Sequence, residues 1–136
     1  MKLLSPLVHG VVDYAVVAAF ALAPTLFDFG GNAATISYVL AAVHLSLSLL
    51  TRYPLGMIKK IAFTTHGAME AAIAVALVAM PWIAGFADTE NARNFFIGSG
   101  IAVALVWLTT QYRTNQVLLR EADWHPHQHS GRAATV

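Results

Sequence analysis

Hydrophobic residues form four long stretches along this chain, and short polar segments separate them. Each stretch approaches the roughly 20 residues that a helix needs to cross a bilayer. Pro6 suits the first turn of a helix, whereas Pro54 disfavours helix in the residue before it. The pattern therefore predicts four membrane-spanning helices, over residues 5–27, 33–52, 61–86 and 92–112.

The composition supports contact with lipid. Of the 136 residues, 57% are hydrophobic and only 11% are charged, whereas about 25% of the residues of a soluble domain are charged. The net charge of +1 gives no reason to expect a nucleic-acid partner. Since the chain has no cysteine, it can form neither a disulfide nor a thiolate metal site. We expect an all-α integral membrane protein, a four-helix bundle in a lipid bilayer.

The chain contains a tandem repeat. His9-Gly10-Val11-Val12-Asp13 recurs 57 positions later as His66-Gly67-Ala68-Met69-Glu70. Beyond the first helix the offset becomes 59, which aligns Asn32 with Asn91, Thr51 with Thr110 and Tyr53 with Tyr112. The repeat predicts two helical hairpins, residues 5–56 and 61–114, related by a pseudo-two-fold axis along the membrane normal. We assign residues 1–114 to this transmembrane domain and 115–136 to a polar tail.

Basic residues predict the orientation of the helices, because cytoplasmic loops carry an excess of Lys and Arg. Seven of the eight basic residues fall on one side of the predicted membrane: Lys2, Arg52, Lys59, Lys60, Arg113, Arg120 and Arg132. Arg93 falls on the other side. Both termini and the middle loop are therefore expected in the cytoplasm.

Each repeat places a histidine and a carboxylate four residues apart, on the same face of a helix. Ionisable groups in spanning helices are costly and commonly mark functional sites. From a helix rise of about 1.5 Å per residue, both histidines lie about one turn inside the cytoplasmic surface, and the carboxylates and His44 lie deeper. We expect these side chains to converge in the cytoplasmic half, with nearby polar groups orienting them. The candidate ligands are His9, Asp13, His44, His66 and Glu70, and the candidate orienting residues are Tyr14, Ser48, Arg52 and Thr65.

Four interpretations of this group remain open. The imidazoles and carboxylates suit a divalent transition metal such as Fe, Zn, Mn or Cu. Alternatively, His9 and His66 could be the axial ligands of a b-type haem held between the hairpins, with His44 as a further cofactor-binding candidate. The network could instead be purely structural, with each histidine paired to a carboxylate. Finally, it could form a path for protons or a substrate.

Binding of a redox cofactor is the preferred hypothesis, because both the histidine and the carboxylate recur, and haem b is placed slightly ahead of a non-haem metal. The expected role is electron transfer or an accessory function in a larger membrane complex. A structural or assembly subunit is the main alternative, and an oligomeric transporter is a weaker one. The sequence shows neither hydrolase machinery nor a phosphate-binding loop, and it leaves open whether the protein is an enzyme. His125, His127 and His129 in the tail could also capture a divalent ion.

The second repeat unit contains Pro81-Trp82 followed by Gly85-Phe86, and then Ala92, Asn94 and Gly98. This pattern resembles the SPW-repeat type of small bacterial membrane protein, which is built from tandem two-helix units with Pro-Trp near the end of the first helix. The resemblance covers roughly residues 66–108. It implies four helices and location in a bacterial inner membrane, and it implies no particular chemistry.

Overall fold

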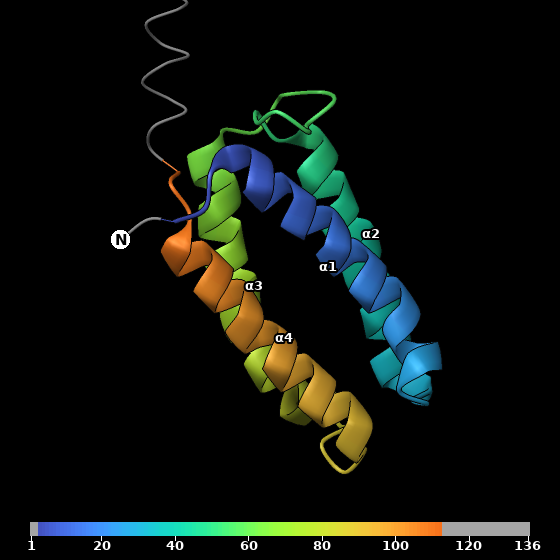
Figure 1. Cartoon of the computed structure of the whole chain (residues 1–136). Helices are drawn as coiled ribbons and strands as arrows, with labels where there is room; N and C mark the ends of the chain where they lie inside the picture. Colours follow the sequence, from blue (N-terminus) through green and yellow to red (C-terminus); the bar gives the residue numbers. More distant parts are fainter. Residues whose placement is uncertain (1–2, 113–136) are drawn as a thin grey trace, which may run out of the picture.

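The computed structural model describes residues 3–112 and confirms an all-α fold for this part of the chain. It contains α1 (Pro6–Leu26), α2 (Gly31–Leu50), α3 (Phe63–Ile83) and α4 (Glu90–Thr109). In Figure 1, α1 lies beside α2 and α3 lies beside α4, so the molecule consists of two helical hairpins. The predicted third helix began two residues too early and ended three residues too late. The predicted second and fourth helices both began two residues too late and ended two and three residues too late, respectively. His125, His127 and His129, the tail histidines that could capture a divalent ion, lie outside the described residues.

The ends of the helices follow from capping residues. The Ser5 side chain accepts a hydrogen bond from the Val8 amide at 3.3 Å, with Pro6 in the first turn, which satisfies one of the free N–H groups there. At the other end, the Phe29 amide donates to the Pro24 carbonyl at 3.1 Å, and the equivalent Phe86 amide donates to Pro81 at 2.9 Å. These six-to-one bonds close the last turns of α1 and α3 in the same way.

The residue that follows the C-cap of each of these helices has a positive φ. Asp28 has a φ of 50° and Gly85, its counterpart in the repeat, has a φ of 71°. This left-handed conformation suits glycine and is tolerated by aspartate. Pro24 and Pro81 therefore lie in the last turn of their helices, and each helix continues for two residues beyond its proline.

All four helices are long and apolar enough to cross a bilayer, with mean hydropathies of 1.4 to 1.8. Only 22% to 33% of the residues in these spans are buried inside the protein. Large apolar side chains such as Leu22, Val75 and Leu105 point outward and are more than half exposed. A continuous apolar exterior of this kind indicates a membrane protein whose surface contacts lipid.

The two hairpins exchange equivalent contacts at both ends. At the end with the N-terminus, Leu4 pairs with Thr110 while Thr51 pairs with Ile61. At the opposite end, the Asn91 side chain donates to the Phe27 carbonyl at 2.9 Å, and the Asn32 side chain donates to Ala84 at 3.4 Å. The partners of each pair correspond under the sequence repeat. The pseudo-two-fold relation therefore extends to the contacts between the hairpins.

Two apolar clusters lie on either side of the polar residues. The larger cluster fills the centre of the bundle and includes Phe20, Leu77 and Phe96. The smaller one lies near the α2–α3 connection and consists of Tyr53, Phe63 and Tyr112, with Leu55 and Trp107 packed against it. The polar side chains of α1 and α3 are held between these clusters.

Candidate metal centre

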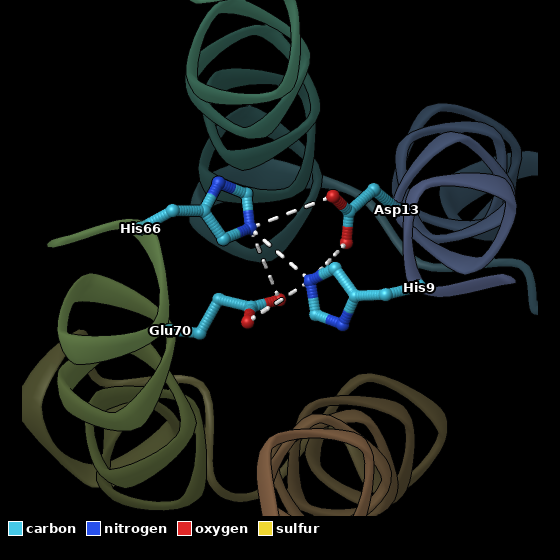
Figure 2. A group of neighbouring side chains, drawn as sticks. All are labelled: His9, Asp13, His66 and Glu70. Carbon is cyan, nitrogen blue, oxygen red and sulfur yellow. Dashed lines mark hydrogen bonds and ion pairs between the residues drawn. The ribbon is translucent and has the colours of Figure 1, made fainter. Parts of the chain in front are cut away.

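His9, Asp13, His66 and Glu70 form one buried group between α1 and α3 (Figure 2). His9 and Asp13 project from α1, and His66 and Glu70 project from α3, so that imidazoles and carboxylates alternate around a common centre. None of the four side chains is more than 2% exposed. The i, i+4 spacing thus aims each pair at its repeat counterpart.

The facing atoms of the group are close to one another. The Nε2 atoms of His9 and His66 lie 3.4 Å apart. His9 Nε2 lies 3.3 Å from oxygens of both Asp13 and Glu70. His66 Nε2 lies 3.4 Å from Asp13 and 3.5 Å from Glu70. One ligand atom from each of the four residues lies within 4.8 Å of all the others, a spacing at which the group could hold a metal ion.

The outer nitrogen of each imidazole is held by a threonine. His66 Nδ1 lies 2.8 Å from the Thr51 hydroxyl, and His9 Nδ1 lies 3.0 Å from the Thr110 hydroxyl. Thr51 donates its proton to the Leu47 carbonyl at 2.6 Å, and Thr110 donates to Val106 at 2.7 Å. Since each hydroxyl has one proton and that proton is already used, each threonine must accept from Nδ1–H. In a neutral imidazole this leaves the Nε2 lone pair facing the centre.

Glu70 and Asp13 differ in their further partners. The Tyr112 hydroxyl donates to Glu70 Oε2 at 2.7 Å. Asp13, the counterpart of Glu70, instead lies beside His44, with His44 Nε2 3.7 Å from Asp13 Oδ1. Between residues 3 and 112, no lysine or arginine forms an ion pair with either carboxylate. The two buried carboxyl groups therefore have imidazole and hydroxyl groups, rather than Lys or Arg side chains, as their neighbours in this part of the chain.

An aromatic layer covers the group on the side of the α2–α3 connection. The Tyr53 and Phe63 rings are stacked with centroids 5.8 Å apart, and Phe63 contacts Tyr112 at 4.8 Å. Phe63 also packs edge-on against His9 at 5.2 Å. Burial raises the pKa of the Tyr53 and Tyr112 phenols above the usual 10.0, and the nearby carboxylates Asp13 and Glu70 raise it further. Both phenols therefore remain protonated and available as hydrogen-bond donors.

His44 lies at the edge of the group. It is 5% exposed, and its ring centroid is 6.3 Å from that of His66. It is not one of the four residues whose ligand atoms converge. The repeat places Val103 at the equivalent position of α4, so His44 makes the surroundings of Asp13 unlike those of Glu70.

The four residues that the sequence suggested as orienting partners are not the ones that hydrogen-bond to the candidate ligands. Tyr14 donates to the Leu55 carbonyl at 3.1 Å, and buried Ser48 donates to the backbone of His44. Arg52 is exposed and donates to the Lys59 carbonyl, and Thr65 is exposed. The contacts are made by Thr51, Thr110 and Tyr112 instead. The sequence could have indicated this role because the repeat aligns Thr51 with Thr110 and Tyr53 with Tyr112.

Comparisons with known proteins give no further assignment. No protein-family model matches the chain, and neither a curated protein nor a solved structure matches it. The resemblance to SPW-repeat proteins therefore remains a prediction, and any function must be argued from the site itself.

Proposed function

We propose that this protein binds one divalent transition-metal ion within the membrane through His9, Asp13, His66 and Glu70. The observation that carries the proposal is the pair of threonine hydrogen bonds to Nδ1 of the two imidazoles. They set both rings with Nε2 toward the carboxylates. Metal-binding histidines typically donate their other N–H to an oxygen in this way, which fixes the tautomer and the ring orientation.

The spacing of the four side chains suits a small ion. A tetrahedral site with metal–ligand distances of about 2.0–2.1 Å has edges of roughly 3.3–3.4 Å. The two Nε2 atoms lie 3.4 Å apart, and each lies 3.3 to 3.5 Å from one oxygen of Asp13 and one oxygen of Glu70, with the two imidazoles facing different oxygens of each carboxylate. These nitrogen–nitrogen and nitrogen–oxygen separations are close to the edge of such a site. Imidazole with carboxylate suits Zn, Fe and Mn, and Cu is also compatible with imidazole. A divalent ion would also neutralise the two carboxylates and so reduce the cost of burying them.

Proton counting supports an ion over a purely structural network. Each Nε2 faces the other imidazole nitrogen and two carboxylates. In the tautomer that the threonines favour, Nε2 carries a hydrogen only when the imidazole is protonated, and that one hydrogen could serve only one of the three. A buried network stabilises a fold when all of its members are satisfied, and a shared cation satisfies all four groups together.

The same geometry favours an ion over haem b. The carboxylates of Asp13 and Glu70 lie within 3.5 Å of both imidazoles. A haem held by His9 and His66 would place a porphyrin ring between the two nitrogens, which lie 3.4 Å apart. Both carboxylates would have to move away, and the imidazoles would have to separate. Haem b is therefore the second candidate cofactor.

The role that we propose for the bound ion is electron transfer, either independently or as an accessory subunit of a larger membrane complex. Fe, Mn and Cu can change oxidation state, whereas Zn cannot, so the identity of the ion decides between a redox and a non-redox role. The excess of Lys and Arg in the terminal segments and the middle loop supports cytoplasmic termini.

Metal analysis of the full chain tests the proposal. His125, His127 and His129 should be replaced by alanine in every sample, and purification should avoid a polyhistidine tag, because both would bind metal on their own. We expect about one equivalent of Fe, Mn, Zn or Cu, no Soret band, and loss of the metal in His9→Ala, His66→Ala and Asp13→Asn. His44→Ala is the matched control, because it removes a neighbouring buried histidine outside the convergent group.

Circular dichroism should accompany each measurement to establish that the variants retain their helices. A folded protein that binds less than a tenth of an equivalent of any metal would overturn the proposal. A Soret band that disappears in His9→Ala would assign haem b instead.

A further inference from the structure

A cavity of about 170 Å³ lies between α1 and α4 and reaches the candidate metal centre. Its lining includes Asp13 and Glu70 together with the apolar Val16, Phe20 and Val103. Its other lining residues include Ala19 and Ala102, which are exposed on the outer surface of the helices. The cavity therefore connects the two carboxylates with the surface that faces lipid.

The equivalent position between α2 and α3 is filled. The repeat aligns Ser99 and Ala102 of α4 with Leu40 and Val43 of α2. These larger side chains, together with His44 and Leu77, leave a space of only about 10 Å³ there. Small residues on α4 thus create an opening that the pseudo-two-fold repeat does not reproduce.

The aromatic layer of Tyr53, Phe63 and Tyr112 closes the opposite side of the centre. None of these three residues is more than 7% exposed, and their rings pack against one another and against the imidazoles. A molecule that reaches Asp13 and Glu70 through the α1–α4 cavity therefore comes from the bilayer, which restricts it to lipid-soluble compounds.

The cavity continues into a second, more open groove of about 460 Å³. Ser99 and Ala102 line both spaces, and the groove extends past Gly98 and Phe95 to Phe27, near the end of α1. The combined shape is a compact chamber at the carboxylates followed by a shallow, mostly apolar path along α4, whose lining also includes Asn91 and Asn94. This shape matches a molecule with a ring at one end and an apolar tail at the other.

We propose that the α1–α4 cavity binds a membrane-soluble hydroquinone, with its ring in the chamber, a hydroxyl group on Asp13 or Glu70, and its tail along α4. The inference rests on the proposed function, since these carboxylates are proposed ligands of the metal ion. It deepens that function by naming the class of molecule that approaches the ion.

The size and chemistry of the chamber support this class. An engineered apolar protein cavity of about 150 Å³ binds benzene, so about 170 Å³ accommodates a single substituted ring. Carboxylates accept hydrogen bonds and present two oxygens each. A hydroquinone supplies hydroxyl donors to them, whereas a lipid acyl chain supplies none. Ser99 is a further lining residue with a polar side chain.

The test is a titration of the full chain in lipid nanodiscs with decyl-benzohydroquinone, using empty nanodiscs of the same lipid as the blank. Calorimetry measures binding, and metal analysis is done on the same samples. The test variant is Ser99→Leu with Ala102→Val, which introduces the residues of the repeat counterparts Leu40 and Val43. We expect saturable binding to the unmodified chain and at least tenfold weaker binding to this variant, with the metal content unchanged.

Two comparisons make the result specific. Ala42→Ile introduces the repeat counterpart Ile101 at an exposed position of α2 outside the cavity, and it should bind the hydroquinone within twofold of the unmodified chain. The dimethyl ether of the same compound keeps the ring and tail but loses both donors, and it should bind at least tenfold more weakly. Equal binding of the ether, or unchanged binding to the Ser99→Leu, Ala102→Val variant, would overturn the inference.

Failure of this inference and failure of the proposed function give different results. A chain that holds one equivalent of metal but does not bind the hydroquinone refutes the inference alone. A chain that binds the hydroquinone in the chamber without any metal supports the cavity assignment and refutes the proposed metal function.

Discussion

The Thr51 hydroxyl accepts a hydrogen bond from Nδ1 of His66 at 2.8 Å, across the junction between the two hairpins. Thr110 and His9 form the equivalent bond in the opposite direction at 3.0 Å. The end of each hairpin therefore orients the imidazole at the start of the other. This reciprocal arrangement links the association of the hairpins to the geometry of the candidate metal centre.

Replacing either threonine should weaken metal binding without abolishing it. Thr51→Val or Thr110→Val keeps the shape of the side chain but removes the acceptor for Nδ1–H, so the imidazole loses its fixed orientation. Loss of such an outer partner typically lowers metal affinity about 10- to 100-fold. Competition with a chelator of known affinity measures the effect. Thr109→Val is the control, because within residues 3–112 the Thr109 hydroxyl donates to backbone carbonyls of its own helix. Unchanged affinity in both test variants would contradict the assigned tautomers.

The bound ion should stabilise the folded protein. A ligand that binds only the native state adds about 2.7 kcal/mol of stability when its free concentration is 100 times its Kd. We expect a chelator to lower the thermal unfolding midpoint of the unmodified chain in detergent. The same chelator should have no effect on His66→Ala. An equal shift in both proteins would place the responsible metal outside the four-residue group.

Gly10 and Gly67 should not tolerate alanine. A Cβ added at Gly10 would overlap the Tyr53 ring, and one at Gly67 would lie 2.6 Å from the Tyr112 ring. Both rings belong to the aromatic layer and are buried, so they cannot move freely. Overpacking of this kind costs typically about 1–3 kcal/mol. Gly98→Ala is the control, because the added methyl meets nothing within 4 Å. Unfolding in a denaturing detergent series measures the difference, and equal stability of all three variants would argue against the close ring packing.

Alkaline pH should destabilise the fold through Tyr53 and Tyr112, which lie just outside the spanning helices. Burial raises the pKa of both phenols above 10.0 in the folded protein. Their contribution to stability is therefore complete below pH 10 and is lost as the pH rises above that value and the phenols of the unfolded chain ionise. The unfolding midpoint should fall more steeply above pH 10 in the unmodified chain than in Tyr53→Phe with Tyr112→Phe. Parallel pH profiles would show that the two phenols are not the cause.

The orientation of the chain can be tested directly because the natural sequence contains no cysteine. A single cysteine at Lys59 should be labelled by a membrane-impermeant maleimide only after the bacterial inner membrane is opened. A single cysteine at Asp88 should be labelled in intact spheroplasts. The reverse pattern would contradict the predicted cytoplasmic position of the middle loop, which follows from the distribution of Lys and Arg.

The sequence determined the main features of the fold by itself. Apolar stretches of spanning length and short polar turns specify four helices, because a backbone in lipid must satisfy its own hydrogen bonds. The repeat of His9-x-x-x-Asp13 as His66-x-x-x-Glu70 identified all four residues of the convergent group, since i, i+4 spacing places each pair on one helix face. The alignment of Thr51 with Thr110 was visible too, but no local pattern connects a threonine with a histidine of another hairpin.

Tertiary structure decided how close these groups come and which neighbours they have. His44 has the expected depth but lies beside Asp13 outside the convergent group, because its contacts depend on how α2 is rotated against α3. Arg52 points away from the centre and bonds to the middle loop. The α1–α4 cavity depends on the packing of Ser99 and Ala102 against another helix, and periodicity within one segment cannot specify such contacts. Helical periodicity in the sequence determines which face of a helix a residue occupies, whereas the packing of the hairpins determines which side chains of other helices that face contacts.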